Sequence, residues 1–214
     1  MPRVDAGDWD RKYAEEGRPW GDEPSPLVTR RLDDARPGRA IDLACGEGRH
    51  ARWLAGKGWK VTAVDFSHTA LQRARELDAT VEWVRADVRQ WEPRGEPPGE
   101  PPATGADLVL ITYLQLPMPQ LHALLIRAVR WLRPGGRLLY LAHSRSNLTY
   151  GAGGPSDAAV LPDVLDLARA SAGLRVAELA HRVRQRDAGL AVDIVLDAHT
   201  WNAAVLPDDL PDDR

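Results

Sequence analysis

The chain has 214 residues, 43% of them hydrophobic, which is enough for one domain with a substantial core. Its net charge of −3 argues against a protein that binds polyanions, so no nucleic-acid partner is expected. The single cysteine, Cys45, excludes an internal disulfide and a thiolate zinc cluster. No apolar run approaches the roughly eighteen residues of a membrane helix, and the N-terminus lacks a signal-peptide pattern. We therefore expect a cytoplasmic protein with no membrane partner.

Residues 1–38 are expected to form an N-terminal helical cap. One helix of this segment contains Trp9 and Tyr13. The other begins at Ser25-Pro26, because serine caps a helix well and proline is favoured at the first helical position.

Residues 39–145 alternate short apolar runs with stretches of helical periodicity. The apolar runs predict strands at 39–44, 60–64, 81–85, 106–112 and 137–142. Apolar residues at helical spacing predict helices within 49–57, 70–77 and 121–132. Ser67 is expected to cap the second of these helices, and Pro134-Gly135-Gly136 to stop the third. The fold class is therefore α/β, with a Rossmann-like, doubly wound and mostly parallel sheet.

One stretch interrupts this alternation. Residues 92–105 (EPRGEPPGEPPATG) are rich in proline and glycine, which sustain neither helix nor sheet. The stretch is an exposed loop or a domain linker. Apolar patterning resumes on both sides, which favours the loop and a single domain spanning 1–214.

The end of the chain has a different pattern. After a helix near 162–172, two extended runs at 174–184 and 190–200 are separated by the turn-like Asp187-Ala188-Gly189. Alternating apolar positions in the second run predict an antiparallel hairpin that closes the sheet. We expect 146–201 to hold an acceptor loop, this helix and the hairpin, and 202–214 to form a solvated tail.

In open parallel sheets, ligands bind beyond the carboxyl ends of the strands. The first strand ends in DLACGEGRH (42–50), where Gly46 and Gly48 permit a tight turn close to a ligand. Gly46-x-Gly48-x-x-Ala51 also fits a dinucleotide-binding pattern, so the motif is ambiguous between cofactors. A plain strand-to-helix turn without a ligand is the structural alternative.

Two further acids follow neighbouring strands. Asp65 ends the second strand and suits hydrogen bonds to ribose hydroxyls, although it is also in place to cap a helix. Asp87 follows the third strand and can accept from an exocyclic amine of adenine, although it is equally a solvated turn residue. The three strand-end signals together are more specific than any one of them.

This ordered series resembles the cofactor half of class I S-adenosylmethionine-dependent methyltransferases. DLACGEG stands where that family commonly has D/E-x-G-x-G-x-G, with Ala44 in place of the first glycine. GEGRHARWLAGKGWKVTAVDFS further resembles small bacterial tellurite-resistance-type and thiopurine-type methyltransferases. WLRPGGRLLYLA resembles the family's helix-to-strand junction. The resemblance covers roughly residues 10–145.

The resemblance implies S-adenosyl-L-methionine as the cofactor, and it implies a place for each of its parts. The methionine part lies over the first strand end, the ribose faces the second, and the adenine lies by the third. An N-terminal segment covers the cofactor. The implied binding residues are Tyr13, Arg18, Trp20, Asp42, Ala44, Gly46, Gly48, Asp65, Phe66, Asp87, Val88 and Thr112.

The ends of the fourth and fifth strands are expected to line the acceptor side. His143 is the candidate for a base or an acceptor contact, and Tyr113 borders the same space. Ordinary hydrogen bonding or packing is the alternative for both. Residues 144–160 are polar and glycine-rich, which suits an acceptor lid or a plain loop. The histidines show no metal-ligand spacing, so no metal is expected.

The implied activity is transfer of a methyl group to a sulfur, nitrogen or oxygen atom of a small molecule, by a monomer or homodimer. An NAD(P)-dependent oxidoreductase is the first alternative, since Asp65 and the glycine turn also suit that cofactor. Against it, the hairpin leaves no second domain to hold a substrate. The second alternative is a non-catalytic nucleoside-binding module on the same fold.

Overall fold

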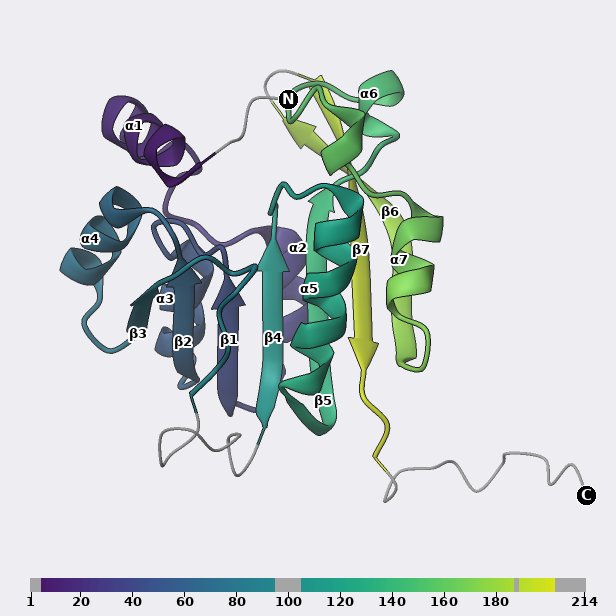
Figure 1. Cartoon of the computed structure of the whole chain (residues 1–214), viewed down its shortest axis with the longest axis horizontal. Coiled ribbons are helices and arrows are strands. Elements are labelled where there is room, and N and C mark those ends of the chain that lie inside the picture. Colours follow the sequence, from purple (N-terminus) through teal and green to yellow (C-terminus); the bar gives the residue numbers. More distant parts are fainter. Residues whose placement is uncertain (1–4, 95–104, 187–188, 203–214) are drawn as a thin grey trace, which may run out of the picture.

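The computed structural model describes residues 5–94, 105–186 and 189–202 (Figure 1). The helices are α1 (Ala6–Glu16), α2 (Pro26–Leu32), α3 (Arg49–Gly56), α4 (His68–Leu77), α5 (Met118–Arg130), α6 (Asn147–Tyr150) and α7 (Val164–Ala170), with a 3-10 turn η1 at Ala158–Val160. The strands are β1 (Arg39–Leu43), β2 (Lys60–Asp65), β3 (Glu82–Arg85), β4 (Ala106–Thr112), β5 (Leu132–His143), β6 (Arg175–Arg186) and β7 (Gly189–His199). Strands and helices alternate from β1 to β3 and again from β4 to β5, and two adjacent strands end the described chain.

All seven strands join one sheet in the order β3-β2-β1-β4-β5-β7-β6. The first five strands along the chain pair in parallel, and β7 pairs antiparallel with both β5 and β6. Strand order reverses between β1 and β4, the place where ligands bind in doubly wound sheets. The expected α/β fold with a closing antiparallel hairpin is confirmed.

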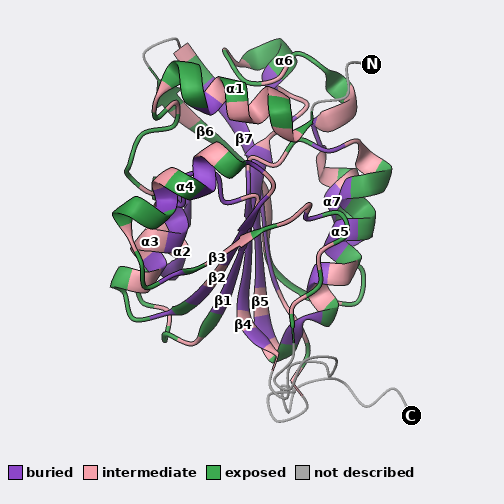
Figure 2. Ribbon diagram, turned by 60° about the vertical axis from the view of Figure 1, so that its left-hand side comes forward, coloured by how far each residue is buried: buried purple, intermediate pink, exposed green. Residues whose placement is uncertain are grey.

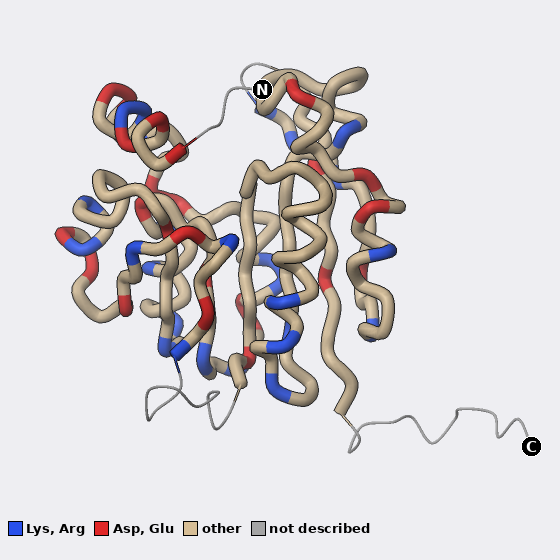
Figure 3. The backbone as a smooth tube through the Cα atoms, in the orientation of Figure 1, with Lys and Arg blue, Asp and Glu red and all other residues tan. Residues whose placement is uncertain are grey.

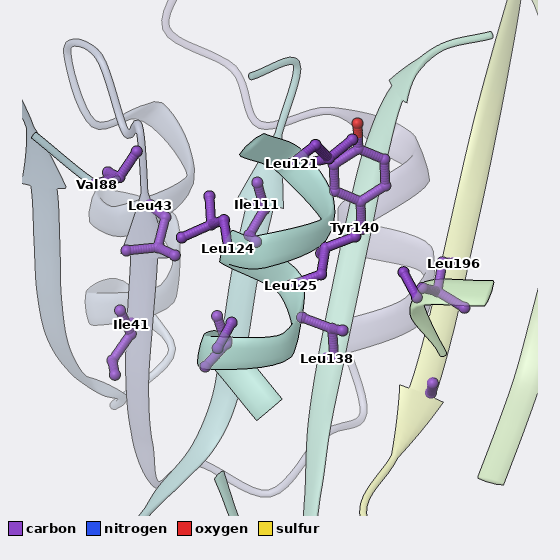
Figure 4. Close-up of a cluster of buried hydrophobic side chains, with 14 of the residues drawn as sticks. Ile41, Leu43, Val88, Ile111, Leu121, Leu124, Leu125, Leu138, Tyr140 and Leu196 are labelled. Carbon is purple, nitrogen blue, oxygen red and sulfur yellow. The ribbon is translucent and has the colours of Figure 1, made fainter. Parts of the chain in front are cut away.

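Helices cover both faces of the sheet, with α2, α3 and α4 on one side and α5 and α7 on the other (Figure 2). Because neighbouring side chains on a strand point to opposite faces, β4 serves two cores. Val109 and Ile111 belong to the α5 side, whereas Leu108 and Leu110 belong to the α2 and α3 side. Figure 4 shows the first cluster around α5, including the ring of Tyr140. Burial of this apolar area on both faces stabilises the sheet.

Polar side chains fix the starts of several helices. Ser25 accepts a hydrogen bond from the Leu27 backbone N–H, with Pro26 at the first helical position. Ser67 accepts from the Ala70 backbone N–H at the start of α4. Both caps satisfy backbone donors that the helix itself leaves unpaired, as the sequence predicts.

Two boundaries differ from the sequence expectation. The helix α5 ends at Arg130, and Pro134-Gly135-Gly136 lies inside β5 rather than stopping the helix. Pairing is already present at Ala106–Leu132, and the register then shifts before Leu108 pairs with Arg137. The glycines therefore serve an irregular strand start, where Gly135 has a φ of +79°.

The segment 144–160 is not a plain loop, because it contains α6 and the turn η1. Asn147 organises it: its Oδ1 accepts from the Val192 backbone N–H at 2.7 Å, and its Nδ2 donates to the Gly153 carbonyl at 2.8 Å. The first bond attaches the segment to β7, and the second joins two parts of the segment itself. The expected turn at Asp187-Ala188 and the tail from 203 onward lie outside the described residues, as does most of the proline-rich stretch.

In the part of the chain that the structure describes, no helix is long and apolar enough to cross a membrane. Lysine and arginine positions are interspersed with aspartate and glutamate positions along the described backbone (Figure 3). The arginines therefore do not gather on one element.

Candidate functional site

The candidate site lies along the carboxyl edge of the parallel strands, with α1 and α6 above it (Figure 1). Two parts of this edge differ in composition. We call the ends of β1, β2 and β3 the donor end, and the ends of β4 and β5 with the facing part of β6 and β7 the acceptor end.

The glycine turn after β1 runs through left-handed backbone conformations. Ala44, Gly46 and Gly48 have φ values of 55°, 56° and 75°. For Ala44 this conformation costs about 1–2 kcal/mol, because its Cβ crowds the backbone. A Cβ on Gly46 would lie 2.5 Å from the Tyr13 hydroxyl oxygen, and one on Gly48 would lie 2.1 Å from the Trp83 ring. Gly48 is therefore required by packing against β3.

Asp42, at the fourth position of β1, is completely buried. Neither of its carboxylate oxygens has a hydrogen-bond partner, although the nearby Ala51 backbone N–H weakly favours the charged form. Burial and the neighbouring Asp65 carboxylate raise the pKa of Asp42 to about 8, against the opposing attraction of Arg49. Buried acids without partners are uncommon and costly, so this carboxyl group is suited to receive a cationic ligand group.

Asp65 ends β2 and is also buried, but its oxygens are engaged. Oδ2 accepts from the Gly46 backbone N–H and Oδ1 from the Ser67 backbone N–H, both at 2.8 Å. Burial raises the pKa of Asp65, and these backbone bonds oppose the rise. Asp65 therefore holds the glycine turn against the start of α4. A carboxylate retains further lone pairs, so these bonds leave acceptor capacity for a ligand hydroxyl.

Asp87 follows β3, and its carboxylate accepts hydrogen bonds from both the backbone and the side chain of Arg89, two residues further on. Its Oδ1 accepts from the Arg89 backbone N–H and from Nε, both at 2.9 Å. This pairing lowers the pKa of Asp87 below its usual value. Val88 is buried in the α5-side core, and Phe66 is half-buried after β2.

The N-terminal segment reaches over the donor end through Tyr13, which is 5% exposed. Burial raises the pKa of this tyrosine, so its hydroxyl stays neutral above Gly46. Trp20 is 45% exposed, and the Lys12 Nζ lies 4.8 Å from its ring centre. Arg18 instead pairs with Asp22 at the surface. The structure brings Tyr13 to the glycine turn and leaves Arg18 at the periphery.

Thr112 ends β4, and its hydroxyl lies 3.3 Å from Nδ1 of His50. The His50 Nε2 accepts from the Ser25 backbone N–H at 3.1 Å, so the proton of the neutral ring is on Nδ1 and is donated to Thr112. Burial, with the Arg49 charge, lowers the pKa of His50 to about 3. This neutral histidine joins α2, α3 and β4, which is a structural role.

The acceptor end contains a cluster that spans four strands. Tyr113, after β4, has a φ of 54° and donates its hydroxyl to Oδ2 of Asp193 at 3.1 Å. The His143 Nδ1 lies 3.1 Å from Oδ1 of the same aspartate, although the ring N–H does not point along that line. Arg184 of β6 forms an ion pair with Asp193. One buried carboxylate therefore has three polar neighbours.

Charge pairing decides the direction in which the pKa of Asp193 is shifted. Burial favours its neutral form, but His143 and Arg184 outweigh burial and lower its pKa. Sequence reasoning identified His143 and Tyr113 and missed Asp193 and Arg184. The available signal was an acid inside the apolar run LAVDIVLDAH, where a buried charge needs a partner.

A small hollow that is open to solvent adjoins this cluster. Its walls come from the ends of β4 and β5, from the segment 144–160 and from the residue after it: Tyr113, Leu114, Gln115, Ala142, His143, Pro155, Val160 and Leu161. Gly154 packs against the His143 ring so closely that a Cβ there would lie 2.8 Å from Cδ2. The segment 144–160 thus covers the acceptor end.

Residues 40–136 match the sequence model of a family described as "Methyltransferase domain". A trans-aconitate 2-methyltransferase from an Azoarcus species is 36% identical over 110 residues, which cover 50% of this chain and 39% of the relative. The chain thus spans less than half the length of this relative.

Solved structures share the fold at low sequence identity. TehB from Haemophilus influenzae has a TM-score of 0.68 at 13% identity, covering 90% of this chain and 67% of that one. The N-methyltransferase NodS from Bradyrhizobium japonicum, in complex with S-adenosyl-L-homocysteine, has a TM-score of 0.66 at 18% identity, covering 90% and 97%. At such identities the likeness shows the fold alone.

Residues 40–136 are thus similar to methyltransferase domains in sequence, and the fold of the chain is similar to that of solved class I methyltransferases. These similarities do not single out tellurite-resistance-type or thiopurine-type enzymes among the relatives.

Proposed function

We propose that this chain is an S-adenosyl-L-methionine-dependent methyltransferase that transfers a methyl group to a sulfur, nitrogen or oxygen atom of a small molecule. The observation that carries the proposal is the buried, unpartnered Asp42 beside the glycine turn. It lies on the strand next to the one that ends in Asp65, and Asp87 follows the strand beyond. A ligand with a cationic amine, a diol and an aromatic amine would engage all three in order.

The chemistry of these residues fits the donor. Asp42 would receive its amino group, which supplies the missing partner, and Asp65 would accept from the ribose hydroxyls while keeping its backbone bonds. Asp87 would accept from the adenine amine, with Phe66 and Val88 beside the base. Ala44, Gly46 and Gly48 present the turn, and Tyr13 and Trp20 of the N-terminal segment cover it.

When bound, S-adenosyl-L-methionine supplies a methyl group on a sulfonium, and the electrons of the breaking S–C bond return to sulfur as the acceptor lone pair forms the new bond. The protein aligns the acceptor for this in-line displacement, and such alignment is worth on the order of 7–11 kcal/mol in well-oriented reactions. Tyr113 and the segment 144–160 hold the acceptor and limit access of water.

His143 is proposed to take the proton that a neutral O–H, N–H or S–H acceptor must lose. The Nδ1 of His143 lies 3.1 Å from Asp193 Oδ1, so a turn of the ring on binding would direct Nδ1–H to this carboxylate and leave Nε2 as the base. Asp193 is a positioning residue, since it stabilises the imidazolium formed when Nε2 accepts the proton. An acceptor that arrives as an anion does not need this step.

The donor is tested by calorimetric titration of S-adenosylhomocysteine and of a nicotinamide dinucleotide into the full chain. We expect binding of the first alone, and binding of the nicotinamide cofactor alone would favour the oxidoreductase. Turnover is then tested with labelled methyl donor against thiols, heterocyclic amines and organic acids, the last because two relatives are named for trans-aconitate. Absence of turnover across the panel would favour a nucleoside-binding module.

The base is tested with His143→Gln. We expect a lower kcat and loss of the acidic limb of the pH profile for protonated acceptors, with unchanged affinity for S-adenosylhomocysteine. The matched control is His122→Gln, on the exposed face of α5. Equal kcat values for His143→Gln and the control would assign His143 to packing. A single domain over 1–214, a cytoplasmic location and a monomeric or dimeric state remain predictions.

A further inference from the structure

Two guanidinium groups flank the ring of Tyr113. The Cζ of Arg49 lies 6.0 Å from the ring centre, and the Cζ of Arg184 lies 5.5 Å from it. Arg49 opens α3 and Arg184 lies on β6, so the fold brings them together from distant parts of the chain. They are close enough that the charge of Arg184 disfavours the charge of Arg49. Like charges in a partly buried place require an explanation.

The acids at this end do not balance these cations. Arg184 is paired with Asp193, which also accepts from Tyr113 and faces His143. Arg49 donates to the Trp20 carbonyl at 2.9 Å, and no carboxylate of the described residues lies within ion-pair distance of it. Arg184 thus has a carboxylate partner and Arg49 has none at that distance, because Asp42, which attracts Arg49 from further away, is itself held largely neutral by burial. A partly buried charge without a counterion is unfavourable, so the site is short of one negative charge.

We propose that Arg49 and Arg184 form an anion subsite, and that the acceptor of this enzyme carries a carboxylate bound there. The inference rests on the proposed function and names its acceptor class. Tyr113 connects the two places: its ring contacts both arginines, borders the hollow, and lies 5.2 Å from the His143 ring. One small molecule therefore reaches from the arginines to the hollow, with its reacting atom at His143.

The placement of Arg184 assigns the carboxylate to the acceptor rather than the donor. Arg184 shares Asp193 with His143 and Tyr113, which makes it part of the acceptor end. The sulfonium of a bound donor adds a further positive charge beside this end, and an anionic acceptor offsets it. The carboxylate of the donor's methionine part is the rival occupant, and affinity measurements separate the two.

The test uses matched acceptors that differ only in charge: mercaptobenzoate with mercaptobenzamide, and hydroxybenzoate with hydroxybenzamide. For the full chain we expect kcat/KM to favour the acid of a pair by about tenfold or more, as a charge-assisted contact provides. Arg49→Gln and Arg184→Gln should each reduce this preference to about threefold or less. Affinity for S-adenosylhomocysteine should stay within about threefold of wild type.

Two controls accompany the test. Arg182→Gln removes an arginine of β6 that pairs with Glu178 and should leave the preference unchanged. Arg184→Lys keeps the charge and should retain part of the preference, even if the glutamine variant unfolds.

Three results would overturn the anion subsite. The first is equal or better turnover of the neutral partners by wild type, and the second is failure of every acid in the panel. The third is that both glutamine variants lose affinity for S-adenosylhomocysteine and keep the preference for acids. That result would mean that the arginines bind the carboxylate of the methyl donor. If wild type fails to bind S-adenosylhomocysteine at all, the proposed function itself fails instead.

Discussion

The donor end and the acceptor end handle buried acids in opposite ways. At the donor end, Asp42 is buried without a partner, and its pKa is raised to about 8. At the acceptor end, Asp193 is equally buried but has Arg184, Tyr113 and His143 around it, and its pKa is lowered. Under the proposed function, we infer that a ligand completes the donor end, whereas the polar contacts of the acceptor cluster are already formed within the chain.

The largest expected effect is on the preassembled cluster. Asp193→Asn removes the carboxylate that Arg184 and His143 share, so we expect the free energy of unfolding to fall by about 2–3 kcal/mol. The estimate lies below that for a fully buried pair because the Arg184 side chain is 26% exposed. Urea unfolding measures it. Glu92→Gln, which breaks a pair with an exposed carboxylate, should cost less than about 1 kcal/mol. Equal losses of unfolding free energy in Asp193→Asn and Glu92→Gln would contradict the view that the acceptor cluster contributes more to stability than an exposed ion pair.

At the donor end, Asp65→Ala should weaken binding of S-adenosylhomocysteine by about 1–3 kcal/mol, since a buried polar partner is lost. The variant also frees the Gly46 and Ser67 backbone N–H groups, so calorimetry is paired with unfolding measurements. Asp78→Ala, at the opposite end of α4, is the control and should bind normally. An unchanged dissociation constant for Asp65→Ala would refute the ribose assignment.

The unpartnered carboxyl group predicts a pH dependence. Because the pKa of Asp42 is higher in the folded than in the unfolded chain, the folded state holds an extra proton between about pH 4 and about pH 8. Wild-type stability relative to Asp42→Asn should therefore fall as pH rises through that range. A parallel pH dependence of the two proteins would contradict the raised pKa.

Ligand binding should reveal the same proton. If the donor's amine pairs with Asp42, binding of S-adenosylhomocysteine at pH 7 lowers the pKa of Asp42, so this carboxyl group releases nearly one proton. Calorimetry in buffers of different ionisation enthalpy counts it. Asp42→Asn should release none and bind more weakly, whereas equal proton release would place the amine elsewhere.

The smallest effect concerns the turn itself. Ala44→Gly removes the left-handed strain of Ala44 but makes the unfolded chain more flexible, so we expect a net stabilisation of about 0.5 kcal/mol. Ala55→Gly, inside α3, should instead destabilise by about 1 kcal/mol. The opposite signs are measured by thermal unfolding. Destabilisation by Ala44→Gly would mean that the strain at Ala44 is smaller than the cost of the added flexibility of the unfolded chain.

The two ends also differ in how far sequence predicts them. The donor end is local, because strand, turn and acid follow one another, and that order is what predicts a site at Asp42, Gly46 and Asp65. The acceptor end depends on the antiparallel pairing of β6 with β7, which brings Arg184 to Asp193. Register across a hairpin is not encoded in a motif, so the partners of His143 were missed. Likewise, Gly135 and Gly136 signal a turn equally well before a strand or inside one.

The contact between Gly48 and Trp83 bears on how the glycine motif is interpreted in related chains of this fold. Any side chain at position 48 collides with the indole, so the glycine is required even in a descendant that has given up catalysis. Presence of the motif therefore does not certify a working enzyme. Replacement of the tryptophan by a smaller residue would remove this collision, but the left-handed backbone at Gly48, with a φ of 75°, would still favour glycine.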